Sequence, residues 1–195
     1  MCGIVGYIGS KDAYPIILNG LKRLEYRGYD SSGICLYDNG KLVSKKSKGK
    51  ISKLEKKISK LKSFSGAVGI GHTRWATHGE PNDKNSHPHS SNSNELYIVH
   101  NGIIENYASL KHELIAEGHK FHTDTDTEVL VNLIEHIQIK ENIKLGEAVQ
   151  LALNYVVGAY AIAVIDIKKP DEIVVARLGS PLCIGVGEDE YFIGS

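Results

Sequence analysis

Apolar strand-like runs and amphipathic helical runs each occur in two groups along this chain, which restricts its fold more than any other feature. A sheet or helix with one hydrophobic face must bury that face against another layer. The chain therefore predicts an α+β fold in which two stacked sheets are flanked by helix layers. The expected strands are 2–8, 33–37, 41–44, 68–72, 96–100, 160–167, 173–178, 182–186 and 191 onward, and the expected helices are 15–25, 106–117, about 125–137 and 145–157.

Local signals support several of these elements. Asn39-Gly40 separates two strand-like runs and suits the type I′ turn of a β-hairpin. Thr125 and Glu128 have the spacing of a capping box at the start of a helix. Several expected strands in the last third, such as 160–167, are continuously apolar, which predicts strands covered on both faces.

Composition indicates one soluble domain and excludes several classes of protein. The chain has 195 residues, enough for a sizeable core, and 23 basic residues balance 23 acidic ones, so no net charge favours nucleic acid or a membrane surface. The longest apolar run, 159–167, is far too short to span a bilayer, and the start does not resemble a signal peptide. We expect residues 1–195 to form one domain that is cut short at its C-terminus, because the chain ends within an expected strand.

Cysteine usage and lysine placement add two further expectations. Cys2, Cys35 and Cys183 are odd in number and widely spaced, which fits a reducing, cytoplasmic compartment rather than a disulfide framework. Residues 41–62 hold ten lysines and one acid, and apolar residues recur there at helical spacing from Ile51 to Leu61. A lysine-rich surface helix explains this run better than a nucleic-acid patch, since no aromatic residues interleave with the lysines.

Cys2 lies directly after the initiator methionine. If Met1 were removed, Cys2 would carry both a thiol nucleophile and an α-amine with a reference pKa of about 7.7–8.0, close to the optimum for a general base. Activation of a nucleophile by the terminal amine of the same chain is a known form of covalent catalysis. The alternative from position alone is a small buried residue in an edge strand.

Four segments are rich in glycine and polar residues where a plain core would be apolar. They are 23–33 (RLEYRGYDSSG), 71–81 (GHTRWATHGEP), 99–106 (VHNGIIEN) and 123–128 (TDTDTE). Together with Cys2, they resemble the glutaminase domain of the class II, N-terminal nucleophile glutamine amidotransferases over essentially the whole chain. The wording of the first two segments favours the branch that forms glucosamine 6-phosphate over the phosphoribosyl-pyrophosphate branch, which typically reads HRGQDS and TRYST.

The resemblance implies a four-layer αββα sandwich of two mainly antiparallel sheets. It also implies hydrolysis of L-glutamine to glutamate and ammonia through a Cys2 thioester, without a metal or an organic cofactor. Asn101 and Gly102 would form the oxyanion hole, through the side-chain NH2 and the backbone N–H. Considered alone, Asn101-Gly102 is a common turn dipeptide.

The family's substrate-binding residues correspond to Arg74, Thr77, His78 and Asp126. Arg74 would clamp the α-carboxylate with its planar fork, Thr77 and His78 would add contacts to that carboxylate, and Asp126 would hold the α-ammonium. Without the resemblance, Arg74 would be interpreted as a surface salt-bridge partner and Asp126 as a cap of the helix that it begins. Asp124 is the less favoured carboxylate.

Three residues are expected to support the site. Arg27 would support the Cys2 loop, and Trp75 would lie in the loop that closes over glutamine, although a core indole is an equal alternative. His87 would support that loop or meet a second domain. His87-Pro88-His89 has no cysteine or carboxylate at ligand spacing, so we expect no metal site.

The resemblance also implies partners beyond L-glutamine. The ammonia would pass to a C-terminal sugar-isomerase domain that holds fructose 6-phosphate, and the full-length enzyme would be a homo-oligomer. Two alternatives remain open at this point: a phosphoribosylamine- or asparagine-forming relative of the same fold, and a non-catalytic domain that senses glutamine if Met1 is retained.

Overall fold

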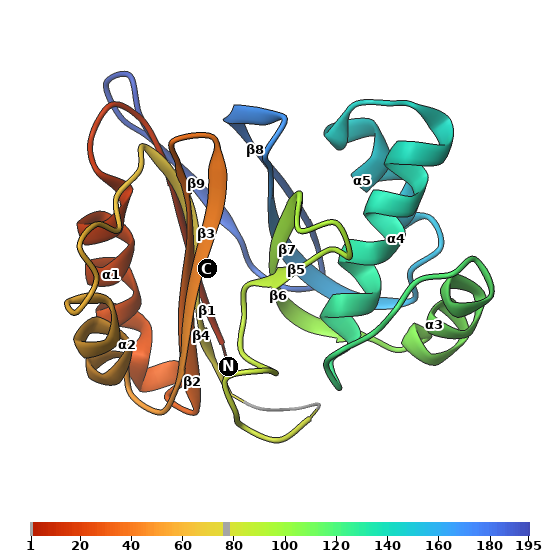
Figure 1. Cartoon of the computed structure of the whole chain (residues 1–195), viewed down its shortest axis with the longest axis horizontal. Helices are drawn as coiled ribbons and strands as arrows, with labels where there is room; N and C mark the ends of the chain where they lie inside the picture. Colours follow the sequence, from red (N-terminus) through yellow and green to blue (C-terminus); the bar gives the residue numbers. More distant parts are fainter. Residues whose placement is uncertain (1, 76–78) are drawn as a thin grey trace.

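The chain forms four layers, two stacked β-sheets with helices on both outer faces, as a computed structural model describing residues 2–75 and 79–195 shows (Figure 1). All strand pairings within the two sheets are antiparallel. The α+β, four-layer αββα prediction is therefore confirmed.

The first sheet has six strands in the order β3-β2-β4-β1-β10-β9. Helices α1 and α2 cover its outer face, and apolar side chains of this sheet and these helices form one core cluster. The elements of this half are β1 (Gly3–Ile8), α1 (Ala13–Leu24), the 3₁₀ helix η1 (Glu25–Arg27), β2 (Ser31–Asp38), β3 (Lys41–Lys48), α2 (Ile51–Ile58), β4 (Val68–Arg74), β9 (Cys183–Val186) and β10 (Tyr191–Gly194).

The second sheet has four strands in the order β5-β6-β7-β8, and helices α3, α4 and α5 cover its outer face. The second sheet and its helices enclose a second core cluster. A third lies between the two sheets, where Ile70 and Val99 meet small residues such as Ala161 and Ala163. The elements of this half are β5 (His89–Ser90), β6 (Leu96–Ile104), α3 (Tyr107–Ala116), α4 (Asp126–Glu141), α5 (Leu145–Leu153), β7 (Gly158–Asp166) and β8 (Lys169–Leu178).

The structure contains the predicted Asn-Gly hairpin and the predicted N-terminal cap of α4. Asn39 and Gly40 both have positive φ, 46° and 81°, and join strands in which Asp38 pairs with Lys41. Thr125 caps α4 by accepting a hydrogen bond from the backbone N–H of Glu128. The Glu128 carboxylate turns away from the cap to accept the N–H groups of residues 122 and 123, so only half of the predicted capping box forms.

The lysine run divides as its local signals predict. Its first half pairs with β2 as strand β3 across the Asn-Gly turn, and the residues at helical spacing form α2. The prediction for the apolar C-terminal strands was wrong in part, because these strands differ from one another. Strand β7 is buried along most of its length, whereas every residue of β9 is exposed, because β9 is the last strand of its sheet in this structure.

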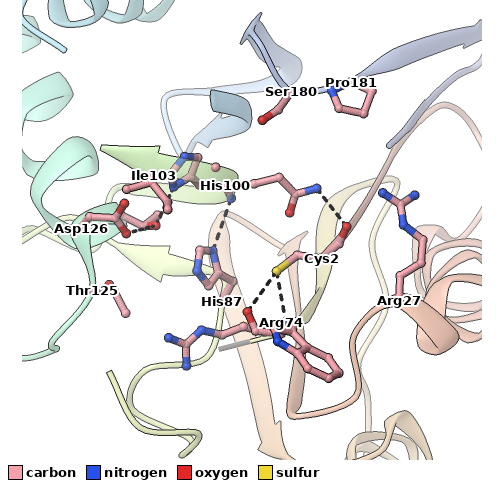
Figure 2. Close-up of a pocket in the computed structure, with 14 residues that line it drawn as sticks. Cys2, Arg27, Arg74, His87, His100, Ile103, Thr125, Asp126, Ser180 and Pro181 are labelled. Atoms are coloured by element: carbon pink, nitrogen blue, oxygen red, sulfur yellow. Dashed lines mark hydrogen bonds between the residues drawn. The ribbon is translucent and has the colours of Figure 1, made fainter. Parts of the chain in front are cut away.

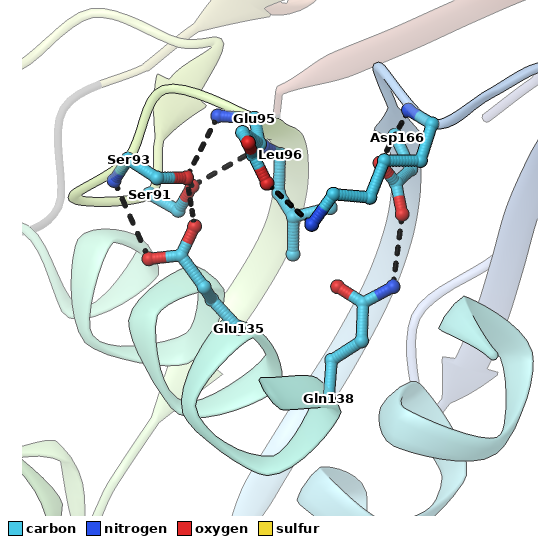
Figure 3. Close-up of polar contacts among 8 residues, drawn as sticks. Ser91, Ser93, Glu95, Leu96, Glu135, Gln138 and Asp166 are labelled. Carbon is cyan, nitrogen blue, oxygen red and sulfur yellow. Dashed lines mark hydrogen bonds and ion pairs between the residues drawn. The ribbon is translucent and has the colours of Figure 1, made fainter. Parts of the chain in front are cut away.

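Polar contacts fix α4 on the second sheet (Figure 3). Gln138 of α4 donates to Asp166 at the end of β7 at 2.9 Å, and Glu135 accepts from the hydroxyl and backbone N–H of Ser93 in the turn before β6. These contacts hold the C-terminal half of the helix. The helix axis, and with it the position of the buried Asp126 at the other end, is thereby set relative to β6.

Candidate active site

A cavity of about 260 Å³ opens where β1, β4 and β6 meet the start of α4 (Figure 2). This is slightly below the roughly 300–1,000 Å³ of sites that take drug-sized ligands, so the cavity suits a small metabolite. It is lined by Cys2, Arg27, Arg74, Trp75, His87, His100, Asn101, Gly102, Ile103, Thr125, Asp126, Thr127, Ser180 and Pro181.

The Cys2 thiol lies at one end of this cavity, directly before β1. Its Sγ accepts a hydrogen bond from the backbone N–H of Trp75 at 3.2 Å. Burial raises the pKa of the Cys2 thiol, while the Trp75 N–H and the positive charge of Arg74 act in the opposite direction. Because the net shift is upward, the thiol is protonated at neutral pH and needs a base before it can attack.

Asn101 and Gly102 lie within β6 and not in a turn, so the turn alternative is wrong. They pair with Ala161 and Tyr160 of β7. Gly102 has φ of 131°, and a Cβ at this position would overlap the carbonyl oxygen of Ala159. Only glycine allows the strand to pass this close to β7 while it lines the cavity.

The Asn101 amide points its NH2 group toward Cys2. Nδ2 donates to the Cys2 carbonyl oxygen at 3.2 Å and to Ser195 Oγ at 3.1 Å, and Oδ1 accepts from His72 Nε2 at 2.9 Å. Cys2 directly precedes β1 and His72 lies in β4, both of the first sheet, whereas Asn101 lies in the second sheet. The amide thus connects the two sheets beside the sulfur.

Arg74 and Asp126 place opposite charges on the same cavity. Arg74 ends β4 and is 4% exposed, with Nη2 donating to the carbonyl oxygen of Gly79 at 3.3 Å. Asp126 begins α4, is 6% exposed, and accepts from the backbone N–H of Ile104 at 2.8 Å. Burial lowers the pKa of the Arg74 guanidinium, and the charges of Cys2, Asp30 and Asp126 oppose that shift.

The simpler interpretations of these two residues are therefore wrong. Arg74 is too deeply buried to be a surface salt-bridge partner, and the residue that caps α4 is Thr125 rather than Asp126. Asp124 faces elsewhere, since its carboxylate accepts from the side-chain amide of Asn85. A buried cation and a buried anion on one small cavity are suited to a zwitterionic ligand.

The expected supporting residues have different surroundings. Arg27 lines the cavity and donates to the carbonyl oxygen of Ser195 at 2.8 Å. Trp75 is 45% exposed and meets Tyr29 edge to face, so the core-indole alternative is wrong. His87 is buried, and its Nδ1 accepts from the backbone N–H of His100. The predicted substrate-binding residues Thr77 and His78 lie outside the described residues.

Sequence reasoning missed several residues of the site. His72 and Ser195 hold Asn101, while Ser180 and Pro181 reach the cavity from the segment after β8. The sequence does carry a signal for His72, because this histidine ends the expected strand 68–72, whose other residues are apolar or glycine. Ser180 and Pro181 carry no comparable signal.

Four buried histidines, His72, His87, His89 and His100, lie near the cavity. His72 stacks on His87 at 4.2 Å between ring centroids, and His87 meets His89 edge to face. Within residues 2–75 and 79–195, no three His, Cys, Asp or Glu side chains are arranged to hold a metal ion. The same residues include no helix that is long and apolar enough to cross a bilayer.

The fold and the site together define the class of protein to which this chain belongs. The family model described as glutamine amidotransferase domain matches residues 72–195, more than half of the chain, and the chain belongs to this family. Over its full length it is 59% identical to glutamine–fructose-6-phosphate aminotransferase (isomerizing) of Bacteroides thetaiotaomicron and 54% identical to that of Chlorobaculum tepidum. The chain spans about a third (32%) of the length of these curated relatives.

Solved structures agree with this assignment. The chain resembles the glutamine phosphoribosylpyrophosphate amidotransferase of B. subtilis with a TM-score of 0.85 and 32% identity, over 99% of this chain and 41% of the other. It also resembles an allosteric regulatory enzyme of purine biosynthesis, with a TM-score of 0.87 and 33% identity over 100% and 42%. A glutamine aminotransferase class-II domain protein of Silicibacter pomeroyi shares the fold at 13% identity, with a TM-score of 0.67 over 99% and 88%.

Proposed function

We propose that this chain hydrolyses L-glutamine to glutamate and ammonia, and that it is the ammonia-supplying part of a glutamine–fructose-6-phosphate aminotransferase. The observation that carries the proposal is the cavity itself. A thiol, an amide donor, a buried cation and a buried anion surround one small space, at Cys2, Asn101, Arg74 and Asp126. Each of these groups matches one part of the glutamine molecule.

The charged pair would hold the amino-acid end of the substrate. Arg74 would bind the α-carboxylate through two parallel N–H donors, and Asp126 would bind the α-ammonium. Thr77 and His78 would add contacts to the carboxylate. Because Cys2 lies on the same cavity as both charges, a side chain of the length of glutamine would carry its amide carbon to the sulfur.

Cys2 would then attack that carbon. The S–C bond forms, the carbonyl electrons move onto oxygen, and the Asn101 side chain with the Gly102 N–H stabilises the oxyanion. The thiol proton passes to the α-amine of Cys2, through a water, and is returned to the leaving ammonia as the C–N bond breaks. Water then hydrolyses the thioester to glutamate and restores the thiol.

This base exists only after Met1 has been removed, because an acylated nitrogen has no lone pair available for a proton. Since burial raises the pKa of the Cys2 thiol, a base is required at neutral pH. Intact-mass analysis of the protein from its own host should therefore show loss of one methionine. A retained methionine would favour a glutamine-sensing role over catalysis.

The remaining parts of the proposal concern the longer protein. The ammonia would pass to a sugar-isomerase domain that holds fructose 6-phosphate, in a homo-oligomeric enzyme of the cytoplasm. The names of the relatives at 59% and 54% identity support this acceptor. None of the three cysteines forms a disulfide, which fits a reducing compartment.

Glutamate release from glutamine tests the proposal directly. The processed wild-type protein should release glutamate and be inactivated stoichiometrically by diazo-oxo-norleucine, whereas Cys2→Ala should lose at least about 10³-fold in turnover. Undiminished turnover in Cys2→Ala would refute the proposal. With the downstream gene segment included, fructose 6-phosphate should be aminated, whereas amination of phosphoribosyl pyrophosphate or aspartate would indicate another branch of the family.

A further inference from the structure

We propose that His72 is a positioning residue that fixes the orientation of the Asn101 side-chain amide, so that its NH2 group faces the Cys2 sulfur. This inference rests on the proposed function, because it concerns the donor that would stabilise the oxyanion. It is carried by the hydrogen bonds around the Asn101 amide and by the ring stack behind His72.

The two ends of the Asn101 amide have partners of opposite kinds. Its nitrogen faces the Cys2 carbonyl oxygen at 3.2 Å, which can only accept a hydrogen bond, and Ser195 Oγ at 3.1 Å. A flipped amide would place its own oxygen against the Cys2 carbonyl, and two acceptors would then face each other. Ser195 Oγ already accepts from the backbone N–H of Ile4 at 2.9 Å, so it too is better suited to receive the amide nitrogen as donor.

The amide oxygen then requires a donor, and His72 Nε2 at 2.9 Å provides it. Burial lowers the pKa of His72 to about 3, so at neutral pH the ring is uncharged and has a single N–H. The bond to Asn101 Oδ1 places that hydrogen on Nε2. A hydrogen on the other nitrogen would leave two acceptors in contact and would release the amide.

The His72 ring is itself held in place. His87 stacks on it at 4.2 Å between centroids and 19° between planes, and His87 Nδ1 accepts the backbone N–H of His100, the residue before Asn101. His72 therefore contacts Asn101 directly and is supported by a ring anchored to the same strand. His72 lies on β4 and Asn101 on β6, so this contact also aligns the two sheets at the cavity.

The consequence for catalysis is specific to oxyanions. A correctly oriented amide presents N–H to the carbonyl oxygen of a tetrahedral intermediate, whereas a flipped amide presents oxygen and repels it. Removing an oxyanion donor costs roughly 10²–10³ in rate, and loss of orientation should cost part of that range. Alkylation of Cys2 at a saturated carbon generates no oxyanion and should be insensitive to the amide.

Two reagents separate these effects in His72→Leu, His72→Gln and wild-type protein. The γ-aldehyde analogue of glutamine adds to the Cys2 thiol and forms a tetrahedral thiohemiacetal, and its affinity measures stabilisation of the oxyanion. Iodoacetamide alkylates the same sulfur with loss of iodide, and intact mass gives the rate. His89→Gln is the matched control, since His89 is a buried histidine of the same cluster whose ring bonds to Thr125 and not to Asn101.

We expect His72→Leu to weaken the aldehyde by about 10- to 100-fold while the alkylation rate stays within about threefold. Glutaminase kcat should fall by a similar factor with little change in KM. His72→Gln should recover most of the loss, because its amide can donate to Asn101 Oδ1, and His89→Gln should leave the ratio of the two reactions unchanged.

Three results would overturn the inference: unchanged aldehyde affinity in His72→Leu, an equal loss of alkylation, or failure of a folded His72→Gln to recover affinity. Neither reagent requires turnover, so both test the role of His72 even if glutamate release is absent. Absence of glutamate release from the processed wild-type protein would count against the proposed function instead.

Discussion

Replacing His72 by glutamine should make the protein less sensitive to acid. His72 is fully buried between the sheets, and burial lowers its pKa from 6.5 to about 3. Glutamine can keep the hydrogen bond to Asn101 but cannot take up a proton. The comparison of wild type with His72→Gln therefore isolates the protonation of one ring.

The size and sign of the effect follow from proton linkage. Between pH 6.5 and about 3 the unfolded chain binds a proton at His72 that the native protein does not bind. The contribution of His72 to the free energy of unfolding is therefore at its maximum above pH 6.5. It falls as the pH drops and stops falling below about pH 3. One proton corresponds to about 1.4 kcal/mol per pH unit, so acidification to pH 4.5 should cost the wild type about 3 kcal/mol more than His72→Gln.

Urea unfolding followed by far-ultraviolet circular dichroism, at several pH values from 7.5 to 4.5, measures this difference. His112→Gln is the control, because it makes the same change of residue type at an exposed position on α3. Burial also lowers the pKa of His87, His89 and His100, and these rings remain in both proteins. Curves for wild type and His72→Gln that stay within about 0.5 kcal/mol of parallel over this range would refute the reasoning.

Three further substitutions test the geometry of the site and of α4. Gly102→Ala places a Cβ against the Ala159 carbonyl at a residue with positive φ. It should lower the free energy of unfolding, measured in urea, by about 3 kcal/mol or more. A loss below about 1 kcal/mol would contradict the close approach of the two strands. Asp126→Asn removes the negative charge that is proposed to bind the α-ammonium of glutamine. It should raise KM for glutamine about 10- to 100-fold in steady-state assays, with a smaller change in kcat. An unaltered KM would exclude that role. Thr125→Ala removes the cap of α4 and should lower the free energy of unfolding by about 0.5–2 kcal/mol, whereas Thr125→Ser should retain most of it in the same unfolding assay.

Much of the fold could be predicted because the signals are local. The Asn39-Gly40 turn requires positive φ at both residues, and this requirement is met within two positions of the chain. The exposure of β9 could not be predicted, because an apolar run of four residues looks the same in a central strand and at an edge. Whether such a strand is covered depends on its neighbours in the sheet, and the run itself does not specify them.

The site divides in the same way. The sequence led us to Cys2, Arg74 and Asp126 through their residue types and motifs, and the structure places all three on one cavity. It did not lead us to the bond between His72 and Asn101. His72 and Asn101 are 29 positions apart in the chain. The bond between them depends on how the two sheets that carry them are aligned when they stack. No spacing or periodicity within one strand contains that information.

The position of the site follows from this stacking. Arg74 ends a strand of the first sheet and Cys2 directly precedes another, while Asn101 and Asp126 come from the second sheet and its helix, so the nucleophile and the amide donor of the site come from different halves of the molecule. The small side chains between the sheets, Ala161 among them, let the layers approach closely, and the Asn101 amide then reaches the backbone of Cys2 itself. Because interiors are packed as densely as organic crystals, a shift of one sheet over the other would not be absorbed gradually. Such a shift would break the hydrogen bond between Asn101 and Cys2 outright. The geometry around the sulfur is therefore a direct consequence of how the two sheets are aligned.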